Sequence, residues 1–219
     1  SVTFSTLGTA TYNVTAADTT TGTLDAGTAD VTINVVGDTT ITTLTAANTD
    51  VTVTGTGDVT VTNPTAADSV GASGLTGALD LDSSLITDVT VSGGTGDNVV
   101  DFAGVTLVNS TVTYIGQSGD DTVSSATALG TVVATFAGGT NSMTANSITD
   151  GTLSVTGGAG AETVSAAALE DGTLAASLGG GDDTVTLSGA VDEATIAINF
   201  GDGVGTLVLG ANESLTAAG

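Results

Sequence analysis

The sequence predicts an all-β protein: a parallel β-solenoid built from coils of about 20 residues. Three observations predict this fold. Short Gly-Asp turns recur along the chain, acidic or amide residues recur upstream of them, and the segments between alternate Val, Leu or Ile with Thr or Ser. Such alternation turns one side of a strand inward and the other outward. A repeat of this length cannot bury an apolar face alone, but stacked copies can.

The Gly-Asp turns are the most regular signal. Each lies between two runs of β-branched or apolar residues, as in VTGTGDVTV (53–61), YIGQSGDDTV (114–123) and LGGGDDTVTL (178–187). Glycine adopts backbone conformations that other residues avoid, and aspartate bonds its own backbone, so the pattern is typical of tight turns. We predict one continuous solenoid over residues 1–219, of about 11 coils, with a degenerate coil or an insertion at 69–87.

A second signal runs in phase with the turns. One acidic or amide residue precedes each incoming strand, and we expect a corner of the coil there: Asp30, Asp50, Asp88, Asn109, Asp150, Asp171 and Glu193. The strand before each turn should then place its apolar residues inside, with Val53, Val91, Val155 and Leu178 in one inward column. Amphipathic helices would need a spacing of three and four residues, which is absent. An antiparallel sandwich stays the alternative, because it also turns every 8–12 residues or so.

The charge of the chain excludes several classes of partner. It has 24 Asp and Glu, and no Lys, Arg, His or Cys. Such a chain cannot neutralise phosphates, so we expect no binding to nucleic acid or to anionic membranes. No stretch is long and apolar enough to predict membrane insertion. Hydrophobic residues nevertheless make up 40% of the chain, with Val and Thr abundant, which favours a folded β protein over a disordered acidic tail.

Calcium is the cofactor that this charge pattern predicts. Coil-on-coil stacking brings the acids of neighbouring turns about 5 Å apart. Like charges at that spacing repel, and no basic side chain is present to separate them. Calcium accepts about six to eight oxygen ligands, backbone carbonyls included, and neutralises two charges.

The turns GGTGDNVV (93–100), GQSGDDTV (116–123) and GGAGAETV (157–164) resemble the glycine- and aspartate-rich nonapeptide of the RTX family. The resemblance implies a parallel β-roll in which turn carbonyls and aspartates hold calcium between coils. Here one motif occurs per coil, whereas the family repeats it in tandem. Together with the charge argument, the resemblance predicts eight metal ligands: Asp58, Asp97, Asp120, Asp121, Glu162, Asp182, Asp183 and Asp202.

Catalysis is not expected. Without His, Cys, Lys or Arg the usual nucleophile–base pairs are absent, and only paired carboxylates could act, as in glycoside hydrolysis. Asp120 with Asp121 and Asp182 with Asp183 are such pairs, but adjacent residues at the start of a strand point to opposite sides. A glycoside-active β-helix enzyme is therefore a distant alternative.

The composition of the whole chain, rich in Thr, Val, Ala, Gly and Asp and without basic residues or Cys, is similar to the repeat regions of bacterial surface-layer proteins secreted by type I systems. We therefore expect a structural protein of the extracellular bacterial cell surface that assembles with copies of itself into a layer or fibre. Cell-surface polysaccharide is a further candidate partner. An RTX-type adhesin or ice-binding stalk is the alternative, suggested by Thr-x-Thr tracts such as VTVTN (59–63). Segments 173–178 and 194–199 lack the tract, which favours ordinary outward threonines.

Overall fold

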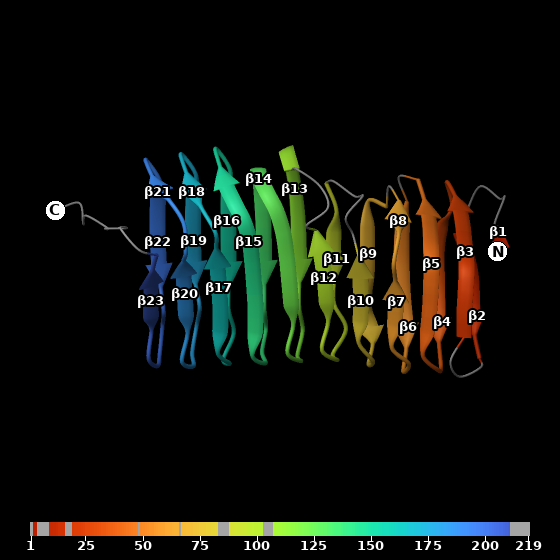
Figure 1. Cartoon of the computed structure of the whole chain (residues 1–219). Coiled ribbons are helices and arrows are strands. Elements are labelled where there is room, and N and C mark those ends of the chain that lie inside the picture. The colour runs from red at the N-terminus through yellow and green to blue at the C-terminus, as the bar shows by residue number, and fades with distance from the viewer. Residues whose placement is uncertain are drawn as a thin grey trace.

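The computed structural model describes residues 2–3, 9–15, 19–47, 49–65, 67–82, 88–102 and 107–210. These residues form a rod of stacked coils (Figure 1). The rod is a parallel β-solenoid of about nine turns, with equivalent residues about 21 positions apart and no helix. The predicted fold class is confirmed. About 11 coils of 20 residues were expected over residues 1–219, whereas the described residues form about nine with a repeat of about 21 residues.

Each coil contributes two main strands, joined by a Gly-Asp turn. First strands enter the turn: β2 (Thr9–Val14), β4 (Asp30–Val35), β6 (Asp50–Gly55), β9 (Ser69–Leu75), β11 (Thr90–Ser92), β13 (Leu107–Ile115), β16 (Thr152–Thr156), β19 (Thr173–Ser177) and β22 (Thr195–Asn199). Second strands leave it: β3 (Thr19–Gly27), β5 (Thr39–Ala46), β7 (Val59–Val61), β10 (Leu79–Asp82), β12 (Val99–Phe102), β15 (Asn141–Thr149), β17 (Glu162–Ala166), β20 (Thr184–Leu187) and β23 (Thr206–Leu209). β14 (Thr122–Thr135) spans a second strand and the next first strand.

Four two-residue strands complete the ladder: β1 (Val2–Thr3), β8 (Pro64–Thr65), β18 (Leu169–Glu170) and β21 (Val191–Asp192). They pair with parts of other coils, as β8 does with β5 and β18 with β15. All described strands therefore belong to one hydrogen-bonded ladder running along the rod.

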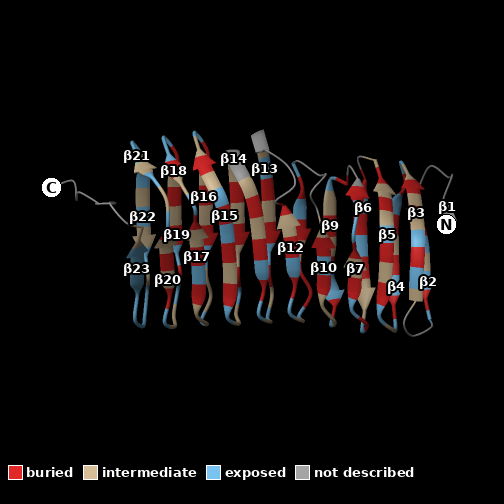
Figure 2. Cartoon of the chain, in the orientation of Figure 1, coloured by how far each residue is buried: buried red, intermediate tan, exposed pale blue. Residues whose placement is uncertain are grey.

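Alternation along the strands builds a narrow core. β4 and β16 alternate buried and more exposed residues, a pattern that Figure 2 shows on most coils. The predicted inward residues Val53, Val91, Val155 and Leu178 are all buried, but they do not share one column. Val91 and Val155 lie in one column, through Tyr114 and Ala134. Val53 pairs with Ile33 in the N-terminal coils, and Leu178 stacks two residues later than Val155, over Gly157. The single-column prediction was wrong because the first strands and turns differ in length between coils.

The predicted corners divide into two kinds. Five of them have a left-handed backbone with φ between 47° and 57°: Asp88, Asn109, Asp150, Asp171 and Glu193. Aspartate and asparagine tolerate this conformation better than most residues, which explains their recurrence before the first strands. Asp30 and Asp50 instead begin strands β4 and β6.

The segment 69–87 continues the ladder as far as it is described. Residues 69–82 form β9 and β10, which pair with strands on both sides. β9 has one more residue than β6 between the partners of Thr52 and Thr54, a β-bulge. Residues 83–87 lie outside the described part of the chain. Within the described residues, no helix has the length and apolarity needed to cross a membrane.

Candidate metal site

The Gly-Asp turns stack in columns along one edge of the rod, the lower edge in Figure 1. The last glycine of each turn lies against the last glycine of the turn before it. A Cβ built on Gly139 or Gly160 would overlap the carbonyl oxygen of the preceding coil, so this position requires glycine. Gly139 also has a φ of 90°, which other residues rarely adopt.

Two columns follow this glycine, and the register of the second strands defines both. The residue directly after the glycine forms what we call the outer column: Asp38, Asp58, Ala78, Asp97, Asp120, Thr140, Ala161, Asp182 and Val204. The next residue forms the inner column: Thr39, Val59, Leu79, Asn98, Asp121, Asn141, Glu162, Asp183 and Gly205.

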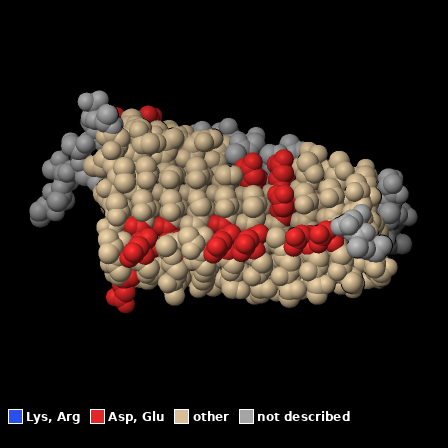
Figure 3. Space-filling model, turned by 60° about the horizontal axis from the view of Figure 1, so that its bottom comes forward, with Lys and Arg blue, Asp and Glu red and all other residues tan. Residues whose placement is uncertain are grey.

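Outer-column carboxylates are exposed and bind the next coil through its backbone. The Asp58 side chain accepts a hydrogen bond from the Ala78 N–H at 2.8 Å, and Asp120 accepts one from the Thr140 N–H at 2.7 Å. Equivalent bonds reach Asp38 from Asp58, Asp97 from Asp120, and Asp182 from Val204. Figure 3 shows acidic side chains in a line along this edge of the rod. Four predicted metal ligands, Asp58, Asp97, Asp120 and Asp182, therefore hold coil to coil by hydrogen bonds.

The inner column points into the rod, and its chemistry changes along the chain. In the N-terminal coils it consists of Thr39, Val59 and Leu79, and the Thr39 hydroxyl donates to its own turn at Gly37 O, 3.0 Å away. In the following coils it consists of polar residues that are at most 2% exposed: Asn98, Asp121, Asn141, Glu162 and Asp183. Buried polar groups of this kind need partners, because burial without them is costly.

Hydrogen bonds link each inner polar residue to the next coil. Asn98 donates to Asp121 Oδ1 from its backbone N–H at 3.0 Å and from Nδ2 at 2.8 Å. The Asp121 N–H donates to Asn141 Oδ1 at 2.9 Å, and Asn141 Nδ2 donates to Glu162 Oε1 at 3.2 Å. The Glu162 N–H donates to Asp183 Oδ1 at 2.9 Å. These five residues form one continuous polar ladder inside the rod.

Each acid of this ladder keeps one oxygen without a hydrogen-bond partner. Asp121 Oδ2, Glu162 Oε2 and Asp183 Oδ2 are buried and unpaired, as is the Tyr114 hydroxyl. Glycines in the turns leave room for two of these carboxylate oxygens. A Cβ built on Gly157 would lie 2.7 Å from Glu162 Oε2, and one built on Gly116 would overlap Asp121 Oδ2. The turns at Gly116 and Gly157 thus form small cradles, each holding a buried carboxylate oxygen of the inner column.

The pKa values of the buried groups are raised, as expected for groups with too few hydrogen-bond partners. Burial raises the pKa of Asp121, although hydrogen bonds from Asn98 oppose the rise. Burial also raises the pKa of Glu162, with Asn141 and Gly158 opposing the rise and the Asp183 carboxylate adding to it. The pKa of Tyr114 is raised by burial and by the Asp121 charge. A bound cation would favour the ionised carboxylates and remove this penalty.

The inner acids fit calcium by these observations: each has a buried, unpaired carboxylate oxygen, and those of Asp121 and Glu162 lie in cradles that a side chain would fill. Among the described residues, no group of three or more acidic, His or Cys side chains is placed to hold a metal ion. An ion in the inner column would therefore need backbone carbonyls of the turns as further ligands, which calcium accepts.

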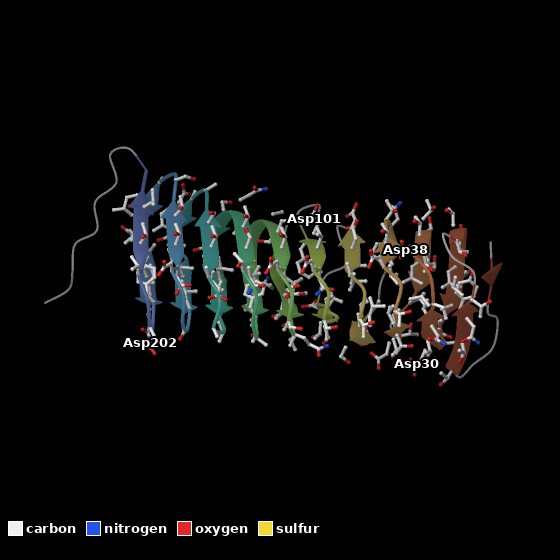
Figure 4. All side chains as sticks on the ribbon, turned by 90° about the horizontal axis from the view of Figure 1, so that it is seen from below. Asp30, Asp38, Asp101 and Asp202 are labelled. Carbon is white, nitrogen blue, oxygen red and sulfur yellow. The ribbon has the colours of Figure 1, made fainter. Side chains whose placement is uncertain are left out.

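The eight predicted ligands thus fall into three groups: four in the outer column, three in the inner column, and Asp202. Asp202 is exposed and is bridged to Gly180, and its N–H donates to Gly179 O at 2.7 Å. It therefore precedes the glycine of its turn and belongs to neither column. In Figure 4 its side chain stands at the C-terminal coil, while Asp30 and Asp101 lie on opposite sides of the rod.

Asn98, Asn141 and Tyr114 were not among the predicted ligands. Aligning the turns on their last glycine, rather than on their first, puts both asparagines in the same column as Asp121 and Glu162. That alignment was available in the sequence.

Comparison with known proteins finds no matching family model, no matching curated protein and no matching solved structure.

Proposed function

We propose that this chain is a structural segment of an extracellular bacterial assembly: a calcium-stabilised rod that associates with copies of itself in a surface layer or fibre. The observation that carries the proposal is the stack of acids. Outer and inner carboxylates lie one coil apart, about 5 Å, in a chain without Lys, Arg or His. An external cation is the simplest neutralising partner for such a stack.

The inner column supports calcium as that cation. Three carboxylate oxygens are buried without partners, in turns whose sequence resembles the RTX nonapeptide. Extracellular calcium modules work at dissociation constants of about 0.1–1 mM, which suits incomplete sites completed by backbone carbonyls. This requirement supports a location outside the cell, at the bacterial surface, where calcium reaches such concentrations.

The outer column supports assembly. Its exposed carboxylates form a line along one edge of the rod (Figure 3), and two such lines repel each other in the absence of cations. Divalent ions between them would turn repulsion into attraction and align neighbouring rods. Calcium thus has two roles in this proposal, inside the coils and between the rods.

A second candidate is the stalk of an adhesin or ice-binding protein, and one observation favours it. The segments without a Thr-x-Thr tract, 173–178 and 194–199, contribute β19 and β22 to the first-strand face. On the second-strand face, hydroxyl residues stay in register over five coils: Thr122, Ser142, Thr163, Thr184 and Thr206. Asp80 and Val99 interrupt this column nearer the N-terminus.

Catalysis finds less support in the site. Asp120 and Asp182 are exposed, whereas Asp121 and Asp183 are buried, so neither pair faces a common substrate position. Glycoside hydrolysis requires two carboxyl groups on either side of one bond. We therefore propose assembly and no enzymatic activity.

Sedimentation velocity and electron microscopy at increasing calcium test the proposal. We expect monomeric rods in excess chelator and ordered sheets or fibres at about millimolar calcium. Sodium chloride at the same ionic strength controls for screening. Magnesium is the second control, because it keeps its waters and should not replace calcium in a dry turn. A monomer at every calcium concentration would contradict the proposal, as would equal assembly in sodium chloride.

A further inference from the structure

The side-chain amides of the inner column occupy positions that resemble cation sites. Asn98 Nδ2 donates to the turn carbonyls Gly94 O and Gly96 O, at 3.3 and 2.7 Å, and to Asp121 Oδ1 of the next coil at 2.8 Å. Three oxygens, two from the turn and one from a carboxylate, thus converge on one nitrogen. Calcium prefers this kind of oxygen environment, but here an NH₂ group fills it.

Asn141 repeats the arrangement two coils later. Its Nδ2 donates to Gly138 O at 3.1 Å, to Gly139 O at 3.4 Å and to Glu162 Oε1 of the next coil at 3.2 Å. The side chain is 2% exposed, so water does not complete its hydrogen bonding. In both coils the partially positive amide meets the turn carbonyls and half-neutralises the acid that follows.

Asp121 is consequently enclosed by amides. Its Oδ1 accepts two hydrogen bonds from Asn98, and its N–H donates to Asn141. Its unpaired Oδ2 and the unpaired Tyr114 hydroxyl both lie against Gly116. A hydroxyl can rotate its hydrogen toward an acceptor, so this carboxyl has a donor within its own cradle.

Glu162 and Asp183 form the one contact of the ladder in which acid follows acid. The Glu162 backbone N–H donates to Asp183 Oδ1 at 2.9 Å, and the two carboxylates repel each other. Glu162 Oε2 and Asp183 Oδ2 are buried, unpaired and one coil apart, and both side chains are 1% exposed. Two carboxylates in this position require a positive charge or a shared proton.

We infer that Asn98 and Asn141 replace the cation in their coils, and that the inner column therefore has one divalent-cation site, between Glu162 and Asp183. The two carboxylates and the carbonyls of their turns supply oxygen ligands for an ion with the size and preferences of calcium. The inference rests on the proposed function for the identity of the ion. It departs from the RTX resemblance, which implies calcium in every such turn.

Native mass spectrometry and calorimetric titration with calcium, at physiological ionic strength to screen the surface acids, measure the number of bound ions. The wild-type chain should bind one ion tightly. Asp183→Asn should bind none, because it removes one of the two carboxylates and leaves an amide after Glu162, as Asn141 follows Asp121. Asn141→Asp should gain a second ion, since it creates a new contact of acid with acid. Asp171→Asn, at an exposed corner on the other end of β19 from the turn, removes the same charge outside both columns and is the matched control, which should bind like the wild type.

Thermal unfolding guards against a misfolded variant. Asp183→Asn should unfold at the same temperature with and without calcium, and in chelator it should be at least as stable as the wild type. Three tightly bound ions in the wild type, or an unchanged number in Asp183→Asn and Asn141→Asp, would overturn the inference. If calcium drives assembly in sedimentation but the wild type does not bind one ion, the proposed function is supported and the single-site inference is overturned. One ion with the expected variants but no assembly supports the inference and overturns the proposed function.

Discussion

The coils before and after residue 88 have the same kind of Gly-Asp turn, but they differ in the residues of the inner column. In the N-terminal coils, over residues 19–82, the outer column carries Asp38 and Asp58 and the inner column is closed by Val59 and Leu79. In the C-terminal coils, over residues 88–210, the outer column again carries aspartates that bind the next coil, but the inner column carries the polar ladder from Asn98 to Asp183. We call these two regions the apolar coils and the polar coils.

The comparison teaches that the turn and the interior of this solenoid are independent. The outer carboxylates bind the next coil in both regions, so they do not decide what the inner column must be. An inner Val or Leu stabilises its coil by about 1.5–3 kcal/mol of apolar burial, without any ligand. An inner acid needs a donor or a cation instead. Because solenoid coils contact only their neighbours, each region should keep its own behaviour.

The largest expected effect comes from placing an acid in the apolar coils. Val59→Asp buries a carboxylate between Thr39 and Leu79, where no amide or cradle receives it. We expect a loss of about 3–5 kcal/mol, the usual range for an uncompensated buried charge, measured by urea unfolding. Adding calcium should not restore the lost free energy of unfolding. Asn141→Asp in the polar coils is the matched change, and its loss should shrink when calcium is added. Equal losses at both positions in calcium would erase the distinction between the regions.

A smaller effect is the pH dependence of the unfolding temperature, to which the inner acids of the polar coils contribute. In the folded, calcium-free chain the pKa values of Asp121 and Glu162 are raised by burial. A carboxyl with a raised folded pKa stabilises the fold below its unfolded pKa, and this stability is lost as pH rises through the folded pKa. The unfolding temperature in chelator should therefore fall as pH rises from about 4 to neutrality.

The double variant Asp121→Asn, Glu162→Gln is the control for this pH dependence. It keeps the repulsion among the other acids but should lose the part of the slope that comes from the inner column. An identical slope in the wild type and the double variant would show that the surface charge alone sets the pH response.

Much of the fold was predictable, because the repeat is visible in the sequence. Gly-Asp turns and the alternation of Val with Thr predicted the parallel solenoid, and corner residues such as Asp150 and Asp171 were placed correctly. The columns were harder. First strands and turns vary in length, so counting from the first glycine put Leu178 beside Val155 and treated Asp120 and Asp121 alike. The sequence placed these adjacent acids on opposite sides of the strand, but the pairing register and burial show which of them lies inside.

The roles of the asparagines could not be read from residue type. Asn98 and Asn141 resemble ordinary turn residues, and their importance comes from what their Nδ2 atoms contact in three dimensions. Tyr114 gave no polar signal either, because its hydroxyl reaches the ladder from the first strand.

The smallest expected effect should be the same in both regions. Asp58→Ala and Asp120→Ala each remove an exposed carboxylate that accepts one backbone N–H from the next coil. We expect each to cost about 1 kcal/mol or less, the net value of such a hydrogen bond. Thermal or urea unfolding of the two variants, side by side, measures this. A cost several times larger at Asp120 would mean that the outer column, too, holds a cation in the polar coils.

Hydrogen–deuterium exchange with and without calcium tests most directly whether one region depends on the cation and the other does not. Peptides covering β4 to β10 should exchange equally slowly in calcium and in chelator, because their inner column is apolar. Peptides covering β15 to β20 should lose protection in chelator and regain it when calcium is restored. Equal loss of protection along the whole rod, or none anywhere, would contradict the account.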